Sequence, residues 1–172
     1  ELVQYLLVKD QKKMPIKRLD ILKNVIREYK GAYTEIINRA GRTLQEVFGL
    51  QLVEIDSKHR TYILTSKLPC AERNHPCRAK EKVKMGLLTV ILSFIFMKGN
   101  SVKDSEGSHH PPPQNRYLEI TVIPLTDPPQ FNYHWGPRAL KETSKKDILN
   151  FVAKVQGKTP KFWMSQYNEA MA

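Results

Sequence analysis

The 172-residue sequence lacks the features of several large protein classes. Its two cysteines, Cys70 and Cys77, are too few to form the framework of a secreted disulfide scaffold, which favours a reduced intracellular setting. Its one strongly apolar run, residues 86–97 (GLLTVILSFIFM), is shorter than the roughly 20 residues that a membrane-spanning helix needs, and it predicts a buried core helix. There is no signal peptide, and the chain opens at Glu1 inside a helical pattern, which indicates a fragment of a longer protein.

Motifs for catalysis and metal binding are also missing. Neither G-x-x-x-x-G-K nor G-x-G-x-x-G occurs. Cys70-x4-His75-x-Cys77 offers ligand types for zinc, but structural zinc takes four ligands, usually as two close pairs, and there is no second pair. The pair His109-His110 stands beside prolines and is interpreted as linker, and neither cysteine is bracketed by the glycine-rich signals of hydrolases. We expect no enzyme, no cofactor and no bound metal.

What the sequence has in excess is positive charge. Its 28 Lys and Arg against 17 Asp and Glu give a formal net charge of +11, which points to an acidic partner such as nucleic acid or a membrane surface. The excess is +8 in residues 1–84 and +3 in residues 85–172, so it sits mainly in the first half. A basic surface that is merely well solvated is the alternative.

Apolar periodicity predicts three helices in the first half of the chain. The first covers about residues 1–10, the second runs from Pro15 to about Tyr29, and the third runs from about Thr34 to Phe48. Gly49 follows the third helix, where a left-handed residue commonly ends a helix.

After Gly49 the pattern becomes strand-like. Residues 50–55 and 61–64 predict a β-hairpin joined by a polar loop. Three helices followed by a hairpin is the layout of a winged helix, whose third helix and wing can straddle a DNA groove and its phosphates. Because no base-reading pattern is present, we expect phosphate contacts with weak sequence preference, unless these charges serve only solvation. The predicted DNA-binding residues are Arg39 and Arg42 on one face of the third helix, Lys58, His59 and Arg60 at the wing tip, and the linker residues Lys80, Lys82 and Lys84.

The second half repeats this plan in altered form. Residues 98–106 resemble a turn and the start of a helix, residues 116–124 and 131–135 are strand-like, and a final helix is expected from Pro160. Another helix is predicted from Ser144, which caps it with Asp147, to Gly157, with an apolar face made of Ile148, Phe151, Val152 and Val155. Trp135 and Trp163 are expected first in the core and second in a partner groove.

These elements predict a mainly α chain with small β-hairpins, an α+β protein with tandem winged-helix domains. The expected divisions are a first domain at residues 1–68, a basic linker at 69–85, and a second domain with a helical tail at 86–172.

Several phrases of the chain resemble the MAGE homology domain. They are NRAGRTLQEVFGLQLVEID, GLLTVILSFIFMKGN, RYLEITVIPLTDPP and above all FNYHWGPRALKETSKKDILNFVAKVQGKTPKFW. The box Trp135-Gly136-Pro137-Arg138 is specific for that family, and the resemblance covers nearly the whole chain. Within the family, LVQYLLVKDQKKMPIKRLDILKNVI and RYLE look most like the type that serves as the MAGE-like non-SMC-element subunit of a DNA-repair SMC complex.

The resemblance implies tandem winged helices and a non-catalytic adaptor that binds and stimulates a RING-type ubiquitin ligase. It also implies a kleisin partner, contact with double-stranded DNA and a nuclear, chromosome-associated location, with no membrane contact. A family dileucine that faces the RING partner matches Leu6 and Leu7, although both leucines could instead fill the core. A ligase cofactor for a non-chromosomal target without DNA binding is the alternative function.

The chain departs from the family pattern between Glu106 and Asn115. There the family has additional residues that supply the helices before the second wing, whereas this chain has only GSHHPPPQ. If the segment near residues 107–114 is missing from the protein rather than skipped in the numbering, the second winged helix lacks its recognition-type helix.

Overall fold

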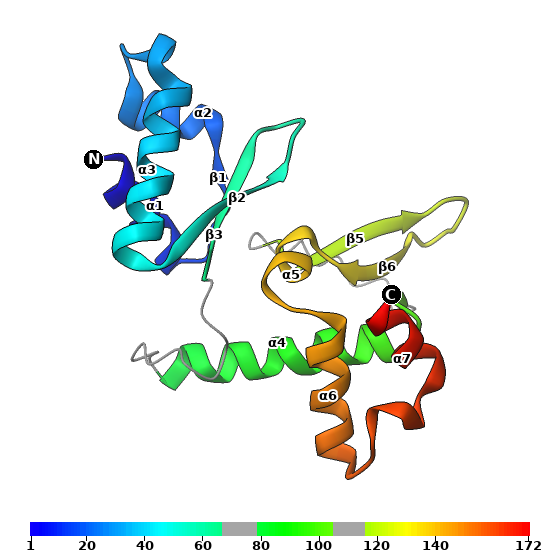
Figure 1. Ribbon diagram of the computed structural model, residues 1–172. Helices are drawn as coiled ribbons and strands as arrows, with labels where there is room; N and C mark the ends of the chain where they lie inside the picture. The colour runs from blue at the N-terminus through cyan, green and yellow to red at the C-terminus, as the bar shows by residue number, and fades with distance from the viewer. Residues whose placement is uncertain (67–78, 105–115) are drawn as a thin grey trace. The chain divides into compact units, whose positions relative to one another are not determined.

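The computed structural model describes residues 1–66, 79–104 and 116–172, and for residues 79–82 it describes the backbone only (Figure 1). The chain divides into two compact units, Glu1–Asn74 and His75–Ala172, which are described separately below. The candidate zinc ligands Cys70, His75 and Cys77 and the pair His109-His110 lie outside the described residues, as does the segment 107–114.

The first unit begins with helix α1 (Leu2–Gln11), as expected. The helix predicted from Pro15 to Tyr29 is wrong at its start, because Ile16 and Lys17 form strand β1 (Ile16–Lys17), paired with Tyr62 and Thr61. Short helical turns follow in the order α2 (Arg18–Ile21), the π-helical turn η1 (Leu22–Ile26) and the 3-10 turn η2 (Lys30–Ala32).

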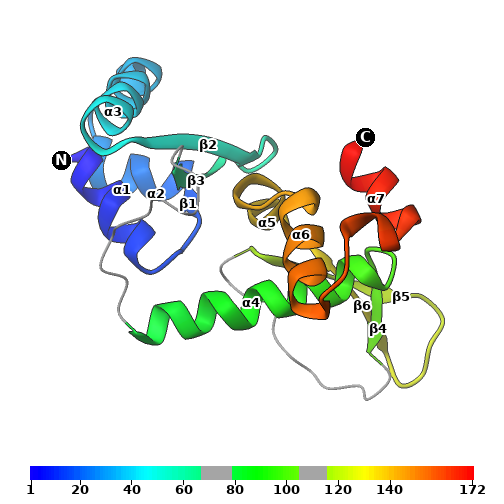
Figure 2. The same ribbon diagram turned by 60° about the horizontal axis from the view of Figure 1, so that its bottom comes forward.

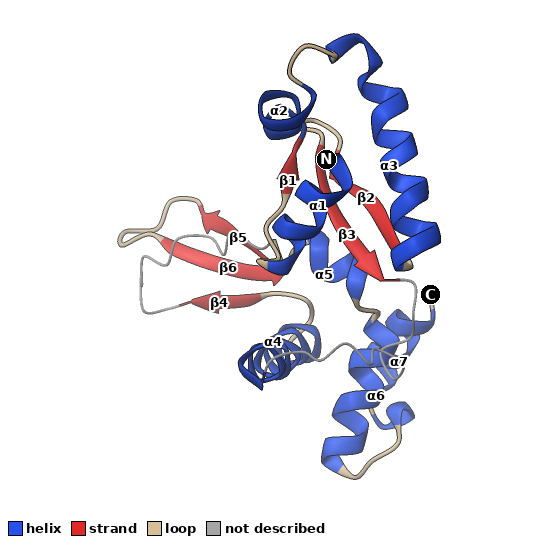
Figure 3. Ribbon diagram, turned by 90° about the vertical axis from the view of Figure 1, so that its left-hand side faces the viewer, coloured by secondary structure: helices blue, strands red, loops and turns tan. Residues whose placement is uncertain are grey.

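Helix α3 (Tyr33–Phe48) and the hairpin of β2 (Leu50–Asp56) and β3 (Thr61–Ser66) complete the first unit as predicted. Gly49 adopts a left-handed conformation with φ 63°, which confirms its role as the residue that ends α3. The three strands form an antiparallel sheet in the order β1-β3-β2 (Figure 3). The core between this sheet and the helices is made of Leu2, Leu6, Ile16, Ile21, Ile26, Tyr33, Ala40, Leu44, Tyr62 and Leu64.

The second unit begins with helix α4 (Ala79–Met97), so the first residues of α4 lie within the stretch 69–85 that was expected to be linker. The expected start of a helix after Lys98 is wrong, because strand β4 (Val102–Asp104) follows α4. The strand-like stretches 116–124 and 131–135 correspond to β5 (Leu118–Ile123) and β6 (Gln130–Trp135). The remaining elements are α5 (Pro137–Glu142), α6 (Lys145–Gln156), the 3-10 turn η4 (Pro160–Phe162) and α7 (Met164–Met171).

Both units place the strand that follows the first helix beside the last strand of the hairpin. The second sheet has the order β4-β6-β5, which repeats β1-β3-β2 (Figure 3). The predicted α+β class and the repeated winged-helix plan are therefore confirmed.

The two units differ in the length of chain between that strand and the hairpin. In the first unit, residues 18–49 hold α2, η1, η2 and the 16 residues of α3. In the second unit, only residues 105–117 lie between Asp104 and Leu118. That length is too small for a helix as long as α3, which agrees with the expected lack of an internal helical segment.

Two helices of the second unit present faces other than those predicted. Ser144 caps α6, since its Oγ accepts a hydrogen bond from the Asp147 N–H at 3.0 Å. Of the predicted apolar face of α6, Ile148 is buried as expected, but the other buried residues are Leu149 and Ala153, while Phe151 and Val155 are exposed. Among residues 83–97, helix α4 is fully buried on one side only, at Leu92, Ser93, Ile95 and Phe96. The helix packs against α6 and β6 (Figure 2).

The Trp135-Gly136-Pro137-Arg138 box joins the hairpin of the second unit to α5. Trp135 lies in the core and its Nε1–H donates to the Leu92 carbonyl at 2.9 Å, which ties β6 to α4. Gly136 passes so close to the backbone that a Cβ atom there would lie 2.3 Å from the Arg116 carbonyl oxygen. The box is therefore a structural element of the core, and Trp163, also expected there, packs partly buried against the same cluster.

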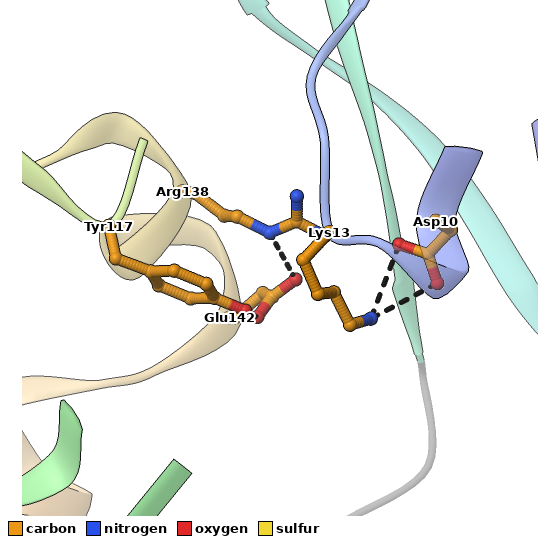
Figure 4. A network of polar contacts seen from close by, with 5 residues as sticks. All are labelled: Asp10, Lys13, Tyr117, Arg138 and Glu142. Atoms are coloured by element: carbon orange, nitrogen blue, oxygen red, sulfur yellow. Dashed lines mark hydrogen bonds and ion pairs between the residues drawn. The ribbon is translucent and has the colours of Figure 1, made fainter. Parts of the chain in front are cut away.

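Arg138 is the largest fully buried side chain of the second unit. Its Nε–H donates to Glu142 Oε1 at 2.9 Å, and the Tyr117 hydroxyl donates to Glu142 Oε2 at 2.5 Å (Figure 4). Burial, together with the neighbouring carboxylate of Glu142, raises the pKa of Tyr117 well above its usual range, so the hydroxyl remains a donor. A buried charge needs such a partner, and the network fixes α5 against Tyr117, the residue that precedes β5.

We predict that Gly136→Ala lowers the free energy of unfolding of the second unit by about 2 kcal/mol or more, because rigid backbone atoms occupy the space of the new methyl group. Gly86→Ala is the matched control, because the new methyl group would have no neighbouring atom within 4 Å. Since alanine also has a higher helix propensity than glycine, this variant should raise the free energy of unfolding by up to about 1 kcal/mol. Both tryptophans belong to the second unit, so denaturant unfolding followed by tryptophan fluorescence measures both variants. Equal stabilities for the two variants would contradict the close packing at Gly136.

Candidate partner-binding and nucleic-acid surfaces

The tip of the first wing is folded by an acidic residue. One carboxylate oxygen of Asp56, Oδ1, accepts hydrogen bonds from the backbone N–H groups of Lys58 at 3.0 Å and His59 at 3.1 Å. The other, Oδ2, lies 2.9 Å from Nδ1 of His59. The side-chain hydrogen bond to His59 is the main reason that the pKa of Asp56 lies below its usual value. This arrangement leaves the side chains of Lys58, His59 and Arg60 exposed to solvent.

The base of the wing carries two further cations that the sequence pattern did not indicate. The Arg60 carbonyl accepts a hydrogen bond from the Arg18 N–H at 2.9 Å, which fastens the wing to the start of α2, directly after β1. Lys17 pairs with Thr61 in the sheet and is exposed. The Arg18 guanidinium lies 4.6 Å from the centre of the Tyr33 ring, a cation–π contact. The dipeptide Lys17-Arg18 was visible in the sequence, but only the pairing of β1 with β3 places it beside the wing.

Acidic residues offset part of the positive charge of this unit. Arg60 Nε lies 4.0 Å from Glu54 Oε1, and on α3 Arg39 Nη1 lies 3.9 Å from Glu35 Oε1. Arg39 and Arg42 are both exposed, as predicted, but Glu35 and Glu46 are exposed on the same helix. The solvent-facing side of α3 thus carries two carboxylates for its two guanidinium groups and is nearly neutral.

The predicted linker lysines belong to α4 in the second unit. Lys84 is exposed. The side chains of Lys80 and Lys82 lie outside the described part of the structure.

The two leucines proposed to meet a RING partner have different environments. Leu6 is fully buried in the core of the first unit, at 0% exposure, so it offers no surface to a partner in this conformation. Leu7 is only partly buried and packs at the edge of that core. Gln4, Leu7 and Val8 follow one another at the i, i+3 and i+4 positions of α1 and form its outer face, on which Val8 is 52% exposed.

A hollow of about 630 Å³ lies beside this outer face of α1. It is lined by Glu1, Gln4, Tyr5 and Val8 of α1 and by residues 24–29, which include the end of the π-helical turn η1. Tyr29 at its edge is 71% exposed. Sequence reasoning missed this hollow because a π-helical turn, a conformation often found at functional sites, has no signal in the apolar pattern.

Within the described residues, no three His, Cys, Asp or Glu side chains are grouped so that they could hold a metal ion. No helix in the same part of the chain has the length and apolar character to cross a membrane.

The chain thus consists of two winged-helix units, the first with an exposed basic wing tip and a hollow beside its first helix. Comparison with known proteins gives its family. Residues 2–110 match the MAGE homology domain, and the chain belongs to that family. It is 43% identical to the human Non-structural maintenance of chromosomes element 3 homolog over 197 residues, covering 100% of this chain and 65% of that protein. It is 42% identical to human Melanoma-associated antigen D2, covering 99% of this chain and 32% of that protein.

Among solved structures, a chain of an Nse1-Nse3-Nse4 complex matches with a TM-score of 0.88 and 46% identity, covering 99% of this chain and 94% of that chain. The chain spans less than two thirds of the length of the human curated relatives named above. The match to the human chromosome-maintenance relative extends over 197 residues, whereas this chain has 172, so the relative has additional residues within the matched region. This difference agrees with the short connection at 105–117.

We predict that Asp56→Ala disorders the wing tip, because it removes the acceptor of two backbone N–H groups, whereas Asp56→Asn keeps a side-chain acceptor and preserves part of the order. ¹⁵N relaxation of the Lys58 and His59 amides measures the effect, and Glu54→Ala on the same hairpin is the control. Unchanged relaxation in Asp56→Ala would show that the carboxylate does not hold the tip.

The order of the tip should also depend on pH, because folding lowers the pKa of Asp56. The stabilisation that the Asp56 carboxylate gives to the tip is present above the unfolded pKa of about 3.9, and it is lost as the pH falls through the lower folded value.

Proposed function

We propose that the chain is a non-catalytic adaptor that binds and stimulates a RING-type ubiquitin ligase within an SMC complex for chromosome maintenance and DNA repair. The observation that carries this proposal is the match over 99% of the chain, at 46% identity and a TM-score of 0.88, to a subunit of an Nse1-Nse3-Nse4 complex. The proposed partners are a RING-type ligase subunit and a kleisin subunit, and the proposed location is the nucleus, on chromosomes.

The proposed ligase contact is the outer face of α1. Leu7 and Val8 are apolar and at least partly exposed, and the hollow beside Val8 offers a concave surface next to them. Apolar anchors beside a hollow are the features that carry most of the energy of a protein interface. In this proposal Leu6 acts indirectly, since it holds α1 in the core while Leu7 meets the partner.

The proposed contact with double-stranded DNA is the first wing. Lys58, His59 and Arg60 are exposed at a tip whose backbone is held by Asp56, and Lys17 extends the positive surface at the base. Ordered cations of this kind suit contacts to phosphates, which fix position without reading bases. Arg39 and Arg42 on α3, and Lys80, Lys82 and Lys84 on α4, are the other proposed DNA-binding residues.

The alternative function is a MAGE-type ubiquitin-ligase cofactor for a non-chromosomal target, without DNA binding. One structural observation favours it: Glu35 and Glu46 offset Arg39 and Arg42 on α3, so the helix that would enter a DNA groove is not strongly positive. The similar identity to Melanoma-associated antigen D2, at 42%, is consistent with either function.

We predict that the chain binds random-sequence duplex DNA and that Lys58→Glu with Arg60→Glu weakens this binding. If each cation neutralises one phosphate, the slope of log K against log salt becomes less steep by about 0.9 for each phosphate that is no longer neutralised, or about 1.8 in the double variant. Gel shifts or anisotropy titrations at several salt concentrations measure the slope. The control is Lys146→Glu with Lys154→Glu, which changes the net charge by the same amount at exposed residues of α6. No duplex binding by the parent chain at low salt would favour the alternative function.

We predict that Leu7→Asp with Val8→Asp reduces capture of the RING subunit of the SMC complex at least about tenfold, because two charges enter an apolar contact. Co-purification with the full chain measures the reduction, and Val47→Asp, at a 67% exposed position on α3, is the control. Leu6→Ala should act differently, by lowering the free energy of unfolding of the first unit by about 2–5 kcal/mol. Undiminished capture by the Leu7 and Val8 double variant would remove α1 as the docking surface.

A further inference from the structure

One wall of the hollow beside α1 is made of irregular backbone. The π-helical turn η1 ends with a hydrogen bond from the Arg27 N–H to the Leu22 carbonyl at 2.8 Å, and Arg27 then adopts φ 43° and ψ −95°. A residue other than glycine rarely has a positive φ, so this conformation is strained. Both π-helical turns and strained residues occur preferentially at functional sites. The hollow, of about 630 Å³, is therefore a candidate binding site in its own right.

Two tyrosines give the hollow flat apolar contact area. Tyr5 on α1 is partly buried, with the Lys9 ammonium 5.6 Å from the centre of its ring, and Tyr29 after η1 is 71% exposed. Val8 and Val25 add apolar atoms to the lining. An exposed aromatic ring beside a concave surface is a common anchor for a partner, so the hollow suits a ligand that carries rings.

The polar side chains of the hollow are mainly hydrogen-bond donors. N–H or O–H groups are carried by Gln4, Tyr5, Asn24, Arg27 and Tyr29. Within the described part of the chain, the one hydrogen bond of these side chains runs from Asn24 Nδ2 to the Tyr5 hydroxyl oxygen, at 3.4 Å. The proton of that hydroxyl group is therefore still available to donate. A ligand that fills the hollow needs acceptors.

A proline-containing segment of a protein chain has this chemistry. Each proline keeps its carbonyl oxygen but has no N–H, so the segment has more acceptors than donors. In the polyproline II conformation it makes no internal hydrogen bonds, and its carbonyl groups remain available to a partner. Grooves lined by aromatic side chains recognise such segments by packing against the proline rings.

The charges of the lining favour a neutral segment. Arg27 and Glu28 are adjacent, exposed and of opposite sign, and Glu1 adds a second carboxylate. A nucleic-acid phosphate would meet these two carboxylates, and a strongly basic segment would meet the Arg27 guanidinium. A proline-containing segment without charge avoids both conflicts.

We propose that the hollow beside α1 binds an extended, proline-containing segment of another protein. The proline rings lie against Tyr5 and Tyr29, and the carbonyl groups accept hydrogen bonds from Gln4 and Asn24. The hollow adjoins the ligase contact proposed above, but the inference does not rest on that function, because any protein that supplies such a segment has the required chemistry.

The test is a titration of two fluorescein-labelled peptides of about ten residues with the full chain, followed by fluorescence anisotropy. One peptide is decaproline, which spans about 31 Å in the polyproline II conformation, and the other is a flexible peptide of alternating glycine and serine. Decaproline should bind at least about tenfold more tightly, because its conformation is formed in advance and its carbonyl groups have no competing N–H groups.

Asn24→Asp tests the donors of the hollow directly. The new side chain has the same shape but can only accept, and it would also take the proton that the Tyr5 hydroxyl has available. This variant should weaken decaproline binding at least about tenfold, and Tyr29→Ala should do the same by removing an exposed ring. Asn150→Asp, at an exposed position on α6, makes the same change of side chain and charge outside the hollow and should leave binding unchanged.

Three results would overturn the inference. Equal binding of the two peptides would mean that proline is not selected, and no binding of decaproline would mean that the hollow does not take such a segment. Undiminished binding by both Asn24→Asp and Tyr29→Ala would place the peptide elsewhere on the chain. None of these measurements involves the RING subunit, so the ligase contact at Leu7 and Val8 stands or fails separately.

Discussion

The pairing of a short strand with the far strand of a hairpin is the interaction on which both units depend. In the first unit Ile16 and Lys17 pair with Tyr62 and Thr61, and in the second Val102 to Asp104 pair with Tyr133 to Phe131. Each pairing returns the chain from the first helix to the sheet and so closes the core between them. In the first unit it also brings Lys17 and Arg18 to the base of the wing. In the second unit the pairing is made even though only residues 105–117 connect β4 to the hairpin.

Local signals allowed much of this fold to be predicted, and non-local pairing accounts for what was missed. Gly49, Ser144 and the alternating stretches of both hairpins fix helix ends and strands through their own neighbours, so they were found from the sequence. Strands β1 and β4 have two and three residues, and their partners lie about 30 to 45 positions away, so no local pattern marks them. The inner faces of α4 and α6 were misjudged for a related reason: an apolar residue such as Val155 is buried only if another element reaches it.

The same distinction applies to the candidate surfaces. The exposed tip of Lys58, His59 and Arg60 could be predicted because a polar loop between two strands must reach solvent. That Asp56 orders this tip, that Leu6 is buried while Leu7 is partly exposed, and that residues 24–29 form a hollow beside α1 all depend on the packing of separate elements. The wing and the α1 face both belong to the first unit, which is a complete winged helix.

The most direct test of this account is amide hydrogen exchange along β6, the central strand of the second sheet. If β4 pairs with one side of β6 and β5 with the other, consecutive amides at Phe131, Asn132 and Tyr133 are all hydrogen-bonded and all should exchange slowly. If the short connection prevents β4 from pairing, β6 is an edge strand and its amides should alternate between slow and fast exchange. Uniform protection at these three residues is the predicted result, and alternation would contradict the claim that the second unit is a closed, shortened winged helix.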